Sequence, residues 1–233
     1  MTYVIADIHG EYEKYKKILE MIHFSDDDTL YVLGDVVDRG PEPMRILQDM
    51  MLRPNVIPII GNHEFMALQC LTFLMKEISR DSIDRLDADF LQGLQNWFDN
   101  GGEATMRDFH GLSRSEREEI LEYLGEFSLC EEVRIAGCDY LLVHAGLENF
   151  APDRPPEDYA PYEMLFGRPD YGKAYFPDKY VVTGHTPTKA IPDNPRPGRI
   201  FRANNHIAID CGCGYGGPLG AICLDTGEEF YAE

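Results

Sequence analysis

Short apolar runs alternate with segments of helical periodicity in the first third of the chain. Apolar runs at residues 3–6, 30–33 and 56–60 are typical of buried strands, and the proline in the third suggests an edge position or a bulge. Between the first two runs, apolar side chains recur at helical spacing from Tyr12 to Ile22. A second helix is expected to begin at Pro41, because proline suits the first turn of a helix. This alternation predicts an α/β fold.

The pattern changes between about residues 68 and 127, where helical periodicity dominates. Ser113 and Glu116 form a capping box ahead of one apolar helix, and Asn100-Gly101-Gly102 marks a break between helices. We expect a helical insertion that lies against or over the functional site, within a single domain of residues 1–233. Apolar runs typical of strands then return in the last hundred residues, at 133–136, 140–143, 180–183, 206–209, 219–224 and 229–231.

Polar side chains follow five of the predicted strands at their carboxyl ends. Ligand sites of open α/β sheets lie at this edge. A single Asp-Gly segment could be a solvated turn, and a single histidine after a strand is more often structural than a ligand. Recurrence at five strand ends favours one shared site instead. The residues are Asp7 with His9, Asp35, Asn62 with His63, His144, and His185.

These side chains offer oxygen and nitrogen ligands without a thiolate. Such a set suits manganese, iron or zinc better than calcium, and it is too large for one tetrahedral ion. Two ions about 4 Å apart, bridged by a carboxylate, would use it fully. Asp35 is the natural bridge. The predicted ligands are Asp7, His9, Asp35, Asn62, His144 and His185.

Five motifs follow one another in order from Asp7 to His185: Asp-x-His, Gly-Asp-x-x-Asp-Arg-Gly, Gly-Asn-His-Glu, His-Ala-Gly and Gly-His-Thr. This set resembles the calcineurin-like metallophosphoesterases. The segment Gly34–Gly40 looks like the version found in the phosphoprotein phosphatase branch, including its small bacterial and phage members. The resemblance implies a four-layer α-β-β-α sandwich with a two-metal site between the sheets.

The resemblance also implies a role for each residue. Asp7, His9 and Asp35 would hold the first metal, and Asp35, Asn62, His144 and His185 the second. Manganese is the expected ion, with iron, zinc or magnesium as alternatives. A hydroxide bridging the two ions would attack phosphorus in line, without a covalent phosphoenzyme. The catalytic residues would be His63 and Asp38 as a general-acid pair and Arg39 and Arg168 as phosphate-binding arginines, with Arg154 as the competitor of Arg168.

The net charge and the composition limit the classes of partner that the protein can bind. With 21 basic and 41 acidic residues, the net charge of −20 opposes sequence-independent binding to nucleic acid and to anionic membrane surfaces. Phosphate must therefore bind where positive charge is concentrated, as two divalent ions and two arginines would provide. The six cysteines form no dense disulfide framework, and no apolar run is long enough to span a bilayer. With no signal-peptide pattern at the first residues, we expect a cytoplasmic location.

We expect a metal-dependent phosphomonoesterase that acts on a phosphorylated protein or peptide, with serine or threonine phosphate first, or on a small phosphoester. One alternative is a symmetrical dinucleoside tetraphosphate hydrolase, although that branch often lacks an aspartate at the position of Asp38. Another is a catalytically silent scaffold, although scaffolds usually lose ligands that this chain keeps.

Two other patterns are set aside. Gly212-x-Gly214-x-x-Gly217 matches a dinucleotide fingerprint, but a strand follows it where a helix is required. Cys211-x-Cys213 lacks partner cysteines at zinc spacing. We interpret this glycine-rich segment as a mobile loop near the pocket.

Overall fold

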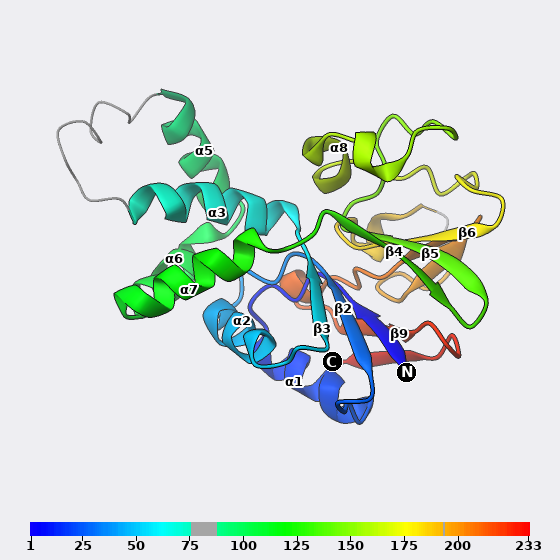
Figure 1. Ribbon diagram of the computed structural model, residues 1–233, viewed down its shortest axis with the longest axis horizontal. Helices are drawn as coiled ribbons and strands as arrows, with labels where there is room; N and C mark the ends of the chain where they lie inside the picture. The colour runs from blue at the N-terminus through cyan, green and yellow to red at the C-terminus, as the bar shows by residue number, and fades with distance from the viewer. Residues whose placement is uncertain (76–87, 193) are drawn as a thin grey trace.

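The computed structural model describes residues 1–75, 88–192 and 194–233, and two five-stranded sheets form the centre of this part (Figure 1). The first sheet has the order β10-β9-β1-β2-β3; β1, β2 and β3 are parallel, and β9 is antiparallel to both β1 and β10. Its strands are β1 (Thr2–Ile5), β2 (Thr29–Leu33), β3 (Val56–Ile59), β9 (Leu219–Cys223) and β10 (Glu229–Ala232). The proline-containing strand β3 lies at the edge, as its sequence predicts.

The second sheet has the order β4-β5-β6-β8-β7. Strands β5, β6 and β8 are parallel, while β4 and β7 pair antiparallel at the two edges. Its strands are β4 (Cys130–Ile135), β5 (Cys138–Val143), β6 (Lys179–Thr183), β7 (Phe201–Ala203) and β8 (His206–Ala208). The first of these begins three residues before the apolar run expected from residue 133, and the short edge strand β7 was not predicted from the sequence.

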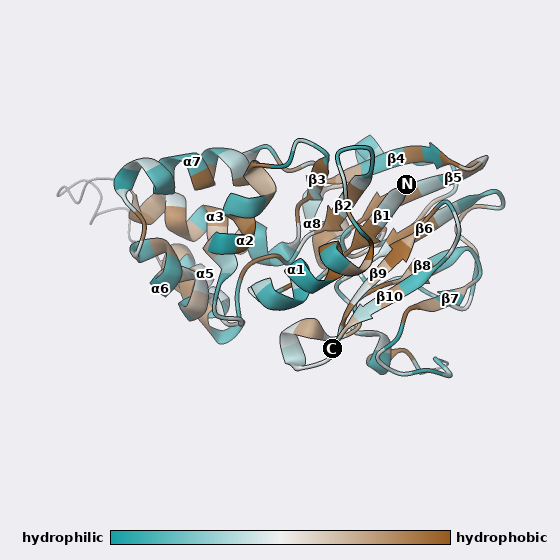
Figure 2. Cartoon of the chain, turned by 90° about the horizontal axis from the view of Figure 1, so that it is seen from below, coloured by the Kyte–Doolittle hydropathy of each residue, from teal (hydrophilic) through white to brown (hydrophobic). Residues whose placement is uncertain are grey.

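Alternation along the central strands sorts side chains into separate buried layers. Val4 lies in the core between the sheets, whereas its neighbour Ile5 lies in the core beneath the outer helices. In the second sheet Leu142 faces the core between the sheets, and Leu141 belongs to a further core on the opposite face. Figure 2 shows hydrophobic residues along the strands and hydrophilic ones on α1. The four-layer α-β-β-α prediction is confirmed.

Helices cover both outer faces. On the first sheet, Tyr15 and Leu47 from two helices pack in one core with Leu30; these helices are α1 (Tyr12–Met21) and α2 (Pro43–Met51). On the second sheet, Met164 of α8 (Pro161–Leu165) packs with Leu141. The second helix begins at Pro43 and not at the expected Pro41, so a different proline occupies its first turn.

The remaining helices gather at one end of the sandwich (Figures 1 and 2). They are α3 (Asn62–Leu74), α5 (Ala88–Asp99), α6 (Gly102–His110) and α7 (Arg114–Gly125). Ser113 caps α7 in the predicted capping box, accepting from the Glu116 amide while its own amide donates to the Glu116 carboxylate. Ile78, expected in this insertion, lies outside the described residues. None of the described helices has the length and apolar composition needed to cross a membrane.

The insertion shares a core with the first sheet. Trp97, Phe109 and Ile120 belong to the same buried cluster as Leu30 and Leu47. Because removing either part would expose the apolar face of the other, we propose that residues 1–233 form one domain.

Candidate metal centre

The side chains predicted from the strand ends meet at one edge of the sandwich. Asp7 and His9 follow β1, Asp35 follows β2, and His144 and His185 follow β5 and β6. Asn62 and His63 lie in the first turn of α3, which begins earlier than the expected start near Phe65. All are buried except His185, which is partly exposed. Segments more than a hundred residues apart therefore supply one polar cluster.

The backbone at this edge is held in an unusual conformation. Several site residues that are not glycine have φ between 48° and 70°, a left-handed region that costs them of order 1–3 kcal/mol each. Backbone hydrogen bonds hold the first two loops together: the Asp7 amide donates to the Gly34 carbonyl and the His9 amide to the Asp35 carbonyl. Such strain is characteristic of functional sites. The residues concerned are Asp7, His9, Asp35, Asp38, Arg39 and His185.

Two groups of potential metal ligands share Asp35. His9 and His63 join it in one group, and His144 and His185 in the other, with the ligand atoms of each group within 4.8 Å of one another. The two carboxylate oxygens of Asp35 face different groups: Oδ2 is 3.7 Å from His9 Nε2 and Oδ1 is 3.4 Å from His144 Nε2. This is the arrangement expected of a bridging carboxylate.

Asp7 lies beside these groups and not within either. Its two carboxylate oxygens accept from the His185 amide at 3.1 and 3.0 Å, which ties the loop after β1 to the loop after β6. Burial, together with the negative charges of Asp210 and Asp35, raises the pKa of Asp7. A nearby cation would reverse this effect, because positive charge favours the ionised carboxylate.

The hydrogen bonds of His144 provide a test of whether a metal ion fits. Its Nδ1 donates to the Leu33 carbonyl at 2.7 Å, so the neutral ring carries a lone pair on Nε2. That lone pair faces two further acceptors, Asn62 Oδ1 at 3.0 Å and Asp35 Oδ1 at 3.4 Å. Three acceptors directed at one another in a buried site repel one another unless a positive charge lies between them. The lone pairs of His144, Asn62 and Asp35 are therefore arranged as ligands of a metal ion would be.

His9 is oriented in the same way. Its Nδ1 donates to the Val37 carbonyl at 2.9 Å, which leaves Nε2 facing Asp35. Arg39 brings positive charge to this place, with Nη1 2.5 Å from His9 Nε2 and Nη2 3.0 Å from His63 Nε2. Burial lowers the pKa of His9 to about 3, so the ring is neutral and able to act as a ligand.

The second group has the same protonation pattern. Burial lowers the pKa of His185 to about 4, with further lowering by His144 and by the positive charge of Arg168. Burial also lowers the pKa of His144. Although burial opposes it, the surrounding imidazoles hold the pKa of Asp35 below its usual range. An ionised carboxylate among neutral imidazoles suits divalent transition metals.

His63 and Asp38 form a buried pair. His63 Nδ1 donates to Asp38 Oδ2 at 2.5 Å, and both side chains are at most 1% exposed. Burial disfavours the imidazolium, but Asp35 and the hydrogen bond to Asp38 outweigh it, so the pKa of His63 is raised. His63 Nε2 points back toward Asp35, at 3.8 Å from Oδ2. A protonated imidazole directed at a metal site can serve as a general acid.

The helical insertion fixes the carboxylate of this pair. Trp97 Nε1 donates to Asp38 at 2.9 Å, and Thr105 Oγ1 donates at 2.5 Å while accepting from the Asp38 amide at 2.8 Å. The neighbouring Arg39 amide donates to the Gly101 carbonyl at 3.1 Å. The insertion therefore lies directly against the site and holds Asp38 in one orientation.

Glu64 supports the loop that carries Asp35. Its fully buried carboxylate accepts from the amides of Asp35, Val36 and Val37 at 2.7, 2.7 and 3.0 Å, and from the Gly61 amide at 2.9 Å. These bonds satisfy amides that would otherwise be buried without partners, and they explain why α3 begins at Asn62. The sequence contained Glu64 within its motif, but nothing in its spacing indicated this role.

The two candidate arginines for phosphate lie in different environments. Arg154 makes two hydrogen bonds to Glu163, at 3.0 and 2.6 Å, and stacks on Tyr159. Arg168 is exposed, has no ion pair within the described part of the chain, and influences His185. Arg154 is therefore already neutralised, and Arg168 is the freer of the two cations.

The glycine-rich segment forms one wall of the site. Residues 213–215 make a short 3₁₀ turn that leads into β9, so the dinucleotide-binding pattern lacks its helix, as argued from the sequence. Gly214 packs on the imidazole of His9, where a Cβ would collide with the ring. Tyr215 stacks over Arg39 at 4.5 Å. All six cysteines are free, including Cys211 and Cys213.

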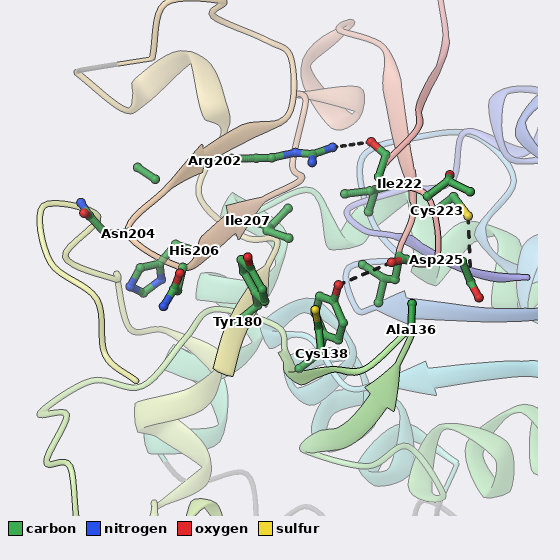
Figure 3. A pocket seen from close by; sticks show the side chains of 16 residues that line it. Ala136, Cys138, Tyr180, Arg202, Asn204, His206, Ile207, Ile222, Cys223 and Asp225 are labelled. Carbon is green, nitrogen blue, oxygen red and sulfur yellow. Dashed lines mark hydrogen bonds between the residues drawn. The ribbon is translucent and has the colours of Figure 1, made fainter. Parts of the chain in front are cut away.

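A cavity of about 530 Å³ lies at the opposite end of the strands (Figure 3). It is lined by Tyr180 and His206 at the starts of β6 and β8, whereas His185 follows the end of β6. None of the predicted site residues lines it. This cavity is therefore separate from the polar centre.

A family model and curated relatives assign the chain to the same family of phosphoesterases. The model of the calcineurin-like phosphoesterase family matches residues 2–208. A symmetrical bis(5'-nucleosyl)-tetraphosphatase from Acidovorax sp. (strain JS42) is 32% identical over 147 residues, which cover 62% of this chain and 43% of that protein. Serine/threonine-protein phosphatase 2 from Salmonella typhimurium is 30% identical over 175 residues, or 73% of this chain and 62% of that protein. The chain thus spans less than half the length of the tetraphosphatase.

Solved structures share the fold at lower identity. A protein serine/threonine phosphatase from Saccharomyces cerevisiae superimposes with a TM-score of 0.57 at 16% identity, over 97% of this chain and 73% of that one. At this level of identity the match supports the architecture alone.

Proposed function

Because the chain belongs to the calcineurin-like phosphoesterase family, we propose that it is a metal-dependent phosphomonoesterase acting on phosphoserine or phosphothreonine in proteins or peptides. The observation that carries the proposal is the position of Asp35 between the neutral imidazole of His9 on one side and those of His144 and His185 on the other, next to the buried His63–Asp38 pair. The ligands on the two sides of Asp35 would hold two divalent ions, with manganese as our first choice. The His63–Asp38 pair would supply a proton to the leaving group.

We assign His9, Asp35 and the adjoining Asp7 to one ion, and Asp35, Asn62, His144 and His185 to the other. Bound there, the ions would activate water as the nucleophile and neutralise charge on the phosphate. His63 lies in the first group by distance, but its hydrogen bond to Asp38 favours an imidazolium, which cannot be a ligand. We therefore assign it a proton-transfer role.

In this mechanism His63 gives its Nε2 proton to the leaving oxygen of the serine or threonine. Asp38 holds the ring by Nδ1 and stabilises its positive charge. Arg39 presents a planar fork of donors that can take two phosphate oxygens, and Arg168 approaches from the side of His185. Water is the nucleophile, so no side chain is phosphorylated.

The proposal is tested by comparing three substrates with added manganese: a phosphoserine peptide, an aryl phosphate and diadenosine tetraphosphate. We expect turnover of the first two and a lower kcat/KM for the dinucleotide. Turnover of the dinucleotide alone would reject a phosphomonoesterase. No turnover of any substrate would favour a scaffold.

A symmetrical dinucleoside tetraphosphate hydrolase is the second candidate. The similarity to the Acidovorax tetraphosphatase favours it. Two observations favour the first candidate: Asp38 is present and held by hydrogen bonds to the side chains of His63, Trp97 and Thr105, and the chain covers a larger share of the Salmonella protein phosphatase.

A further inference from the structure

Two exposed side chains continue the positive edge of the site away from the metal groups. Tyr215 is 58% exposed, and two cations contact its ring: Arg39 Cζ is 4.5 Å from the ring centre and Lys189 Nζ is 5.1 Å from it. Cations are attracted to the face of an aromatic ring at these distances. Lys189, Tyr215 and Arg39 thus form a row that begins above the imidazoles of His9 and His63.

The backbone holds this row in place. Lys189 belongs to a short turn whose preceding residue, Thr188, is buried and donates its amide to the Asp210 carbonyl. On the other side, Lys14 Nζ donates to the Gly217 carbonyl at 2.6 Å and Cys213 Sγ to the Ile8 carbonyl at 3.5 Å. Both turns are therefore anchored to the body of the protein.

Lys189 makes no ion pair in the described part of the chain, although its charge and that of Arg39 act on the buried Asp210 and partly offset the raised pKa of this carboxyl group. Most described arginines outside the site pair with a carboxylate, as Arg154 and Arg202 do, in a chain with a net charge of −20. Within the described ranges, no carboxylate lies within ion-pair distance of Lys189. An unpaired cation beside a phosphate site attracts a further negative group.

We propose that Lys189 and Tyr215 form a second subsite, which binds an anionic group of the substrate close to the scissile phosphate. This inference rests on the proposed function and adds a preference among its substrates. Arg39 and Lys189 each lie within about 5 Å of one ring centre. Side chains two residues apart on an extended peptide share a face and are about 7 Å apart. A phosphoserine and an acidic residue two positions away can therefore reach both cations.

The test compares two phosphoserine peptides that differ in charge and not in shape, with Asp or with Asn two residues before and after the phosphoserine. We expect kcat/KM to be threefold to fivefold higher for the Asp peptide, about the contribution of one exposed ion pair. Because Lys189 is exposed, the preference should shrink between about 0.05 M and 1 M salt. Diadenosine tetraphosphate forms a second arm, in which the extra negative group is a phosphate.

Substitutions assign the preference to this subsite. Lys189→Ala should bring the Asp-to-Asn ratio close to one, and Lys189→Glu should invert it. Lys179→Ala serves as the control for a distant lysine. Lys179 pairs with Glu132 and starts β6 at the opposite end from His185, so its loss should leave the ratio as in the parent protein.

Each outcome decides the question. A Lys189→Ala loss confined to the Asp peptide supports a carboxylate ligand, and a loss confined to the dinucleotide supports a phosphate ligand. The subsite is refuted if the parent protein turns over the Asn peptide without preferring either the Asp peptide or diadenosine tetraphosphate. It is also refuted if the preference survives Lys189→Ala. In both cases the proposed function stands. Absence of turnover on every substrate removes both.

Discussion

Thr105→Val isolates the contribution of the helical insertion to the catalytic pair. The substitution keeps the shape of a side chain that is fully buried, but it removes the hydroxyl that donates to Asp38 Oδ1 and accepts from the Asp38 amide. A hydrogen bond to a charged group contributes about 1.5–3 kcal/mol, and a buried amide without a partner costs about 1–3 kcal/mol. Since neighbouring terms do not add fully, we expect the free energy of unfolding to fall by about 2–4 kcal/mol.

The protein supplies a matched control for this experiment. Thr188 is also fully buried, but its hydroxyl has no hydrogen-bond partner among the described residues, so Thr188→Val breaks no hydrogen bond and should not lower the free energy of unfolding. Both variants are measured by denaturant unfolding. Thr105→Val should also lower kcat about tenfold, because Asp38 then orients His63 less firmly. Equal losses of stability in the two variants would refute the reasoning.

The remaining predictions concern the site itself. His63→Asn should lower kcat by about 100-fold or more, as expected for a lost general acid. Elemental analysis should find the same metal content in this variant as in the parent protein. His110→Asn, at an exposed position, is the control. Asp35→Asn should lower the metal content as well as the activity, and an unchanged metal content would argue against Asp35 as the bridge. Arg168→Ala should raise KM about tenfold, whereas Arg154→Ala should change it less than twofold; the reverse order would exchange the two assignments.

The sequence predicted the parts of this molecule that depend on local pattern. The buried strands carry recognisable apolar runs, and the carboxyl ends of parallel strands of one sheet lie at one edge. This rule places Asp7 with Asp35 in the first sheet and His144 with His185 in the second, whereas only the family resemblance brought the two pairs to one site. Boundaries were less accurate: α3 begins at Asn62 because Glu64, folding back on the Gly61 amide, caps it. The edge strand β7 is too short to leave a periodic signal.

Residues that act through long-range contacts escaped the sequence analysis. Trp97 has the spacing of an ordinary apolar helix residue, and nothing local indicates that its Nε1 donates to Asp38, 59 positions away. Lys189 and Tyr215 lie on separate turns that meet only after both sheets have formed. Such pairings are set by tertiary structure, which periodicity does not encode.

In the proposed mechanism the insertion is therefore part of the catalytic apparatus and not only a cover for it. Asp38 accepts from Trp97 of α5 and Thr105 of α6, and the same helices share a core with the first sheet. These donors hold the Asp38 carboxylate in one orientation, with Oδ2 directed at His63 Nδ1. Changes that loosen α5 or α6 should accordingly lower proton transfer before they lower metal binding, because Asp35 and its imidazoles are held by the strand ends and by Glu64.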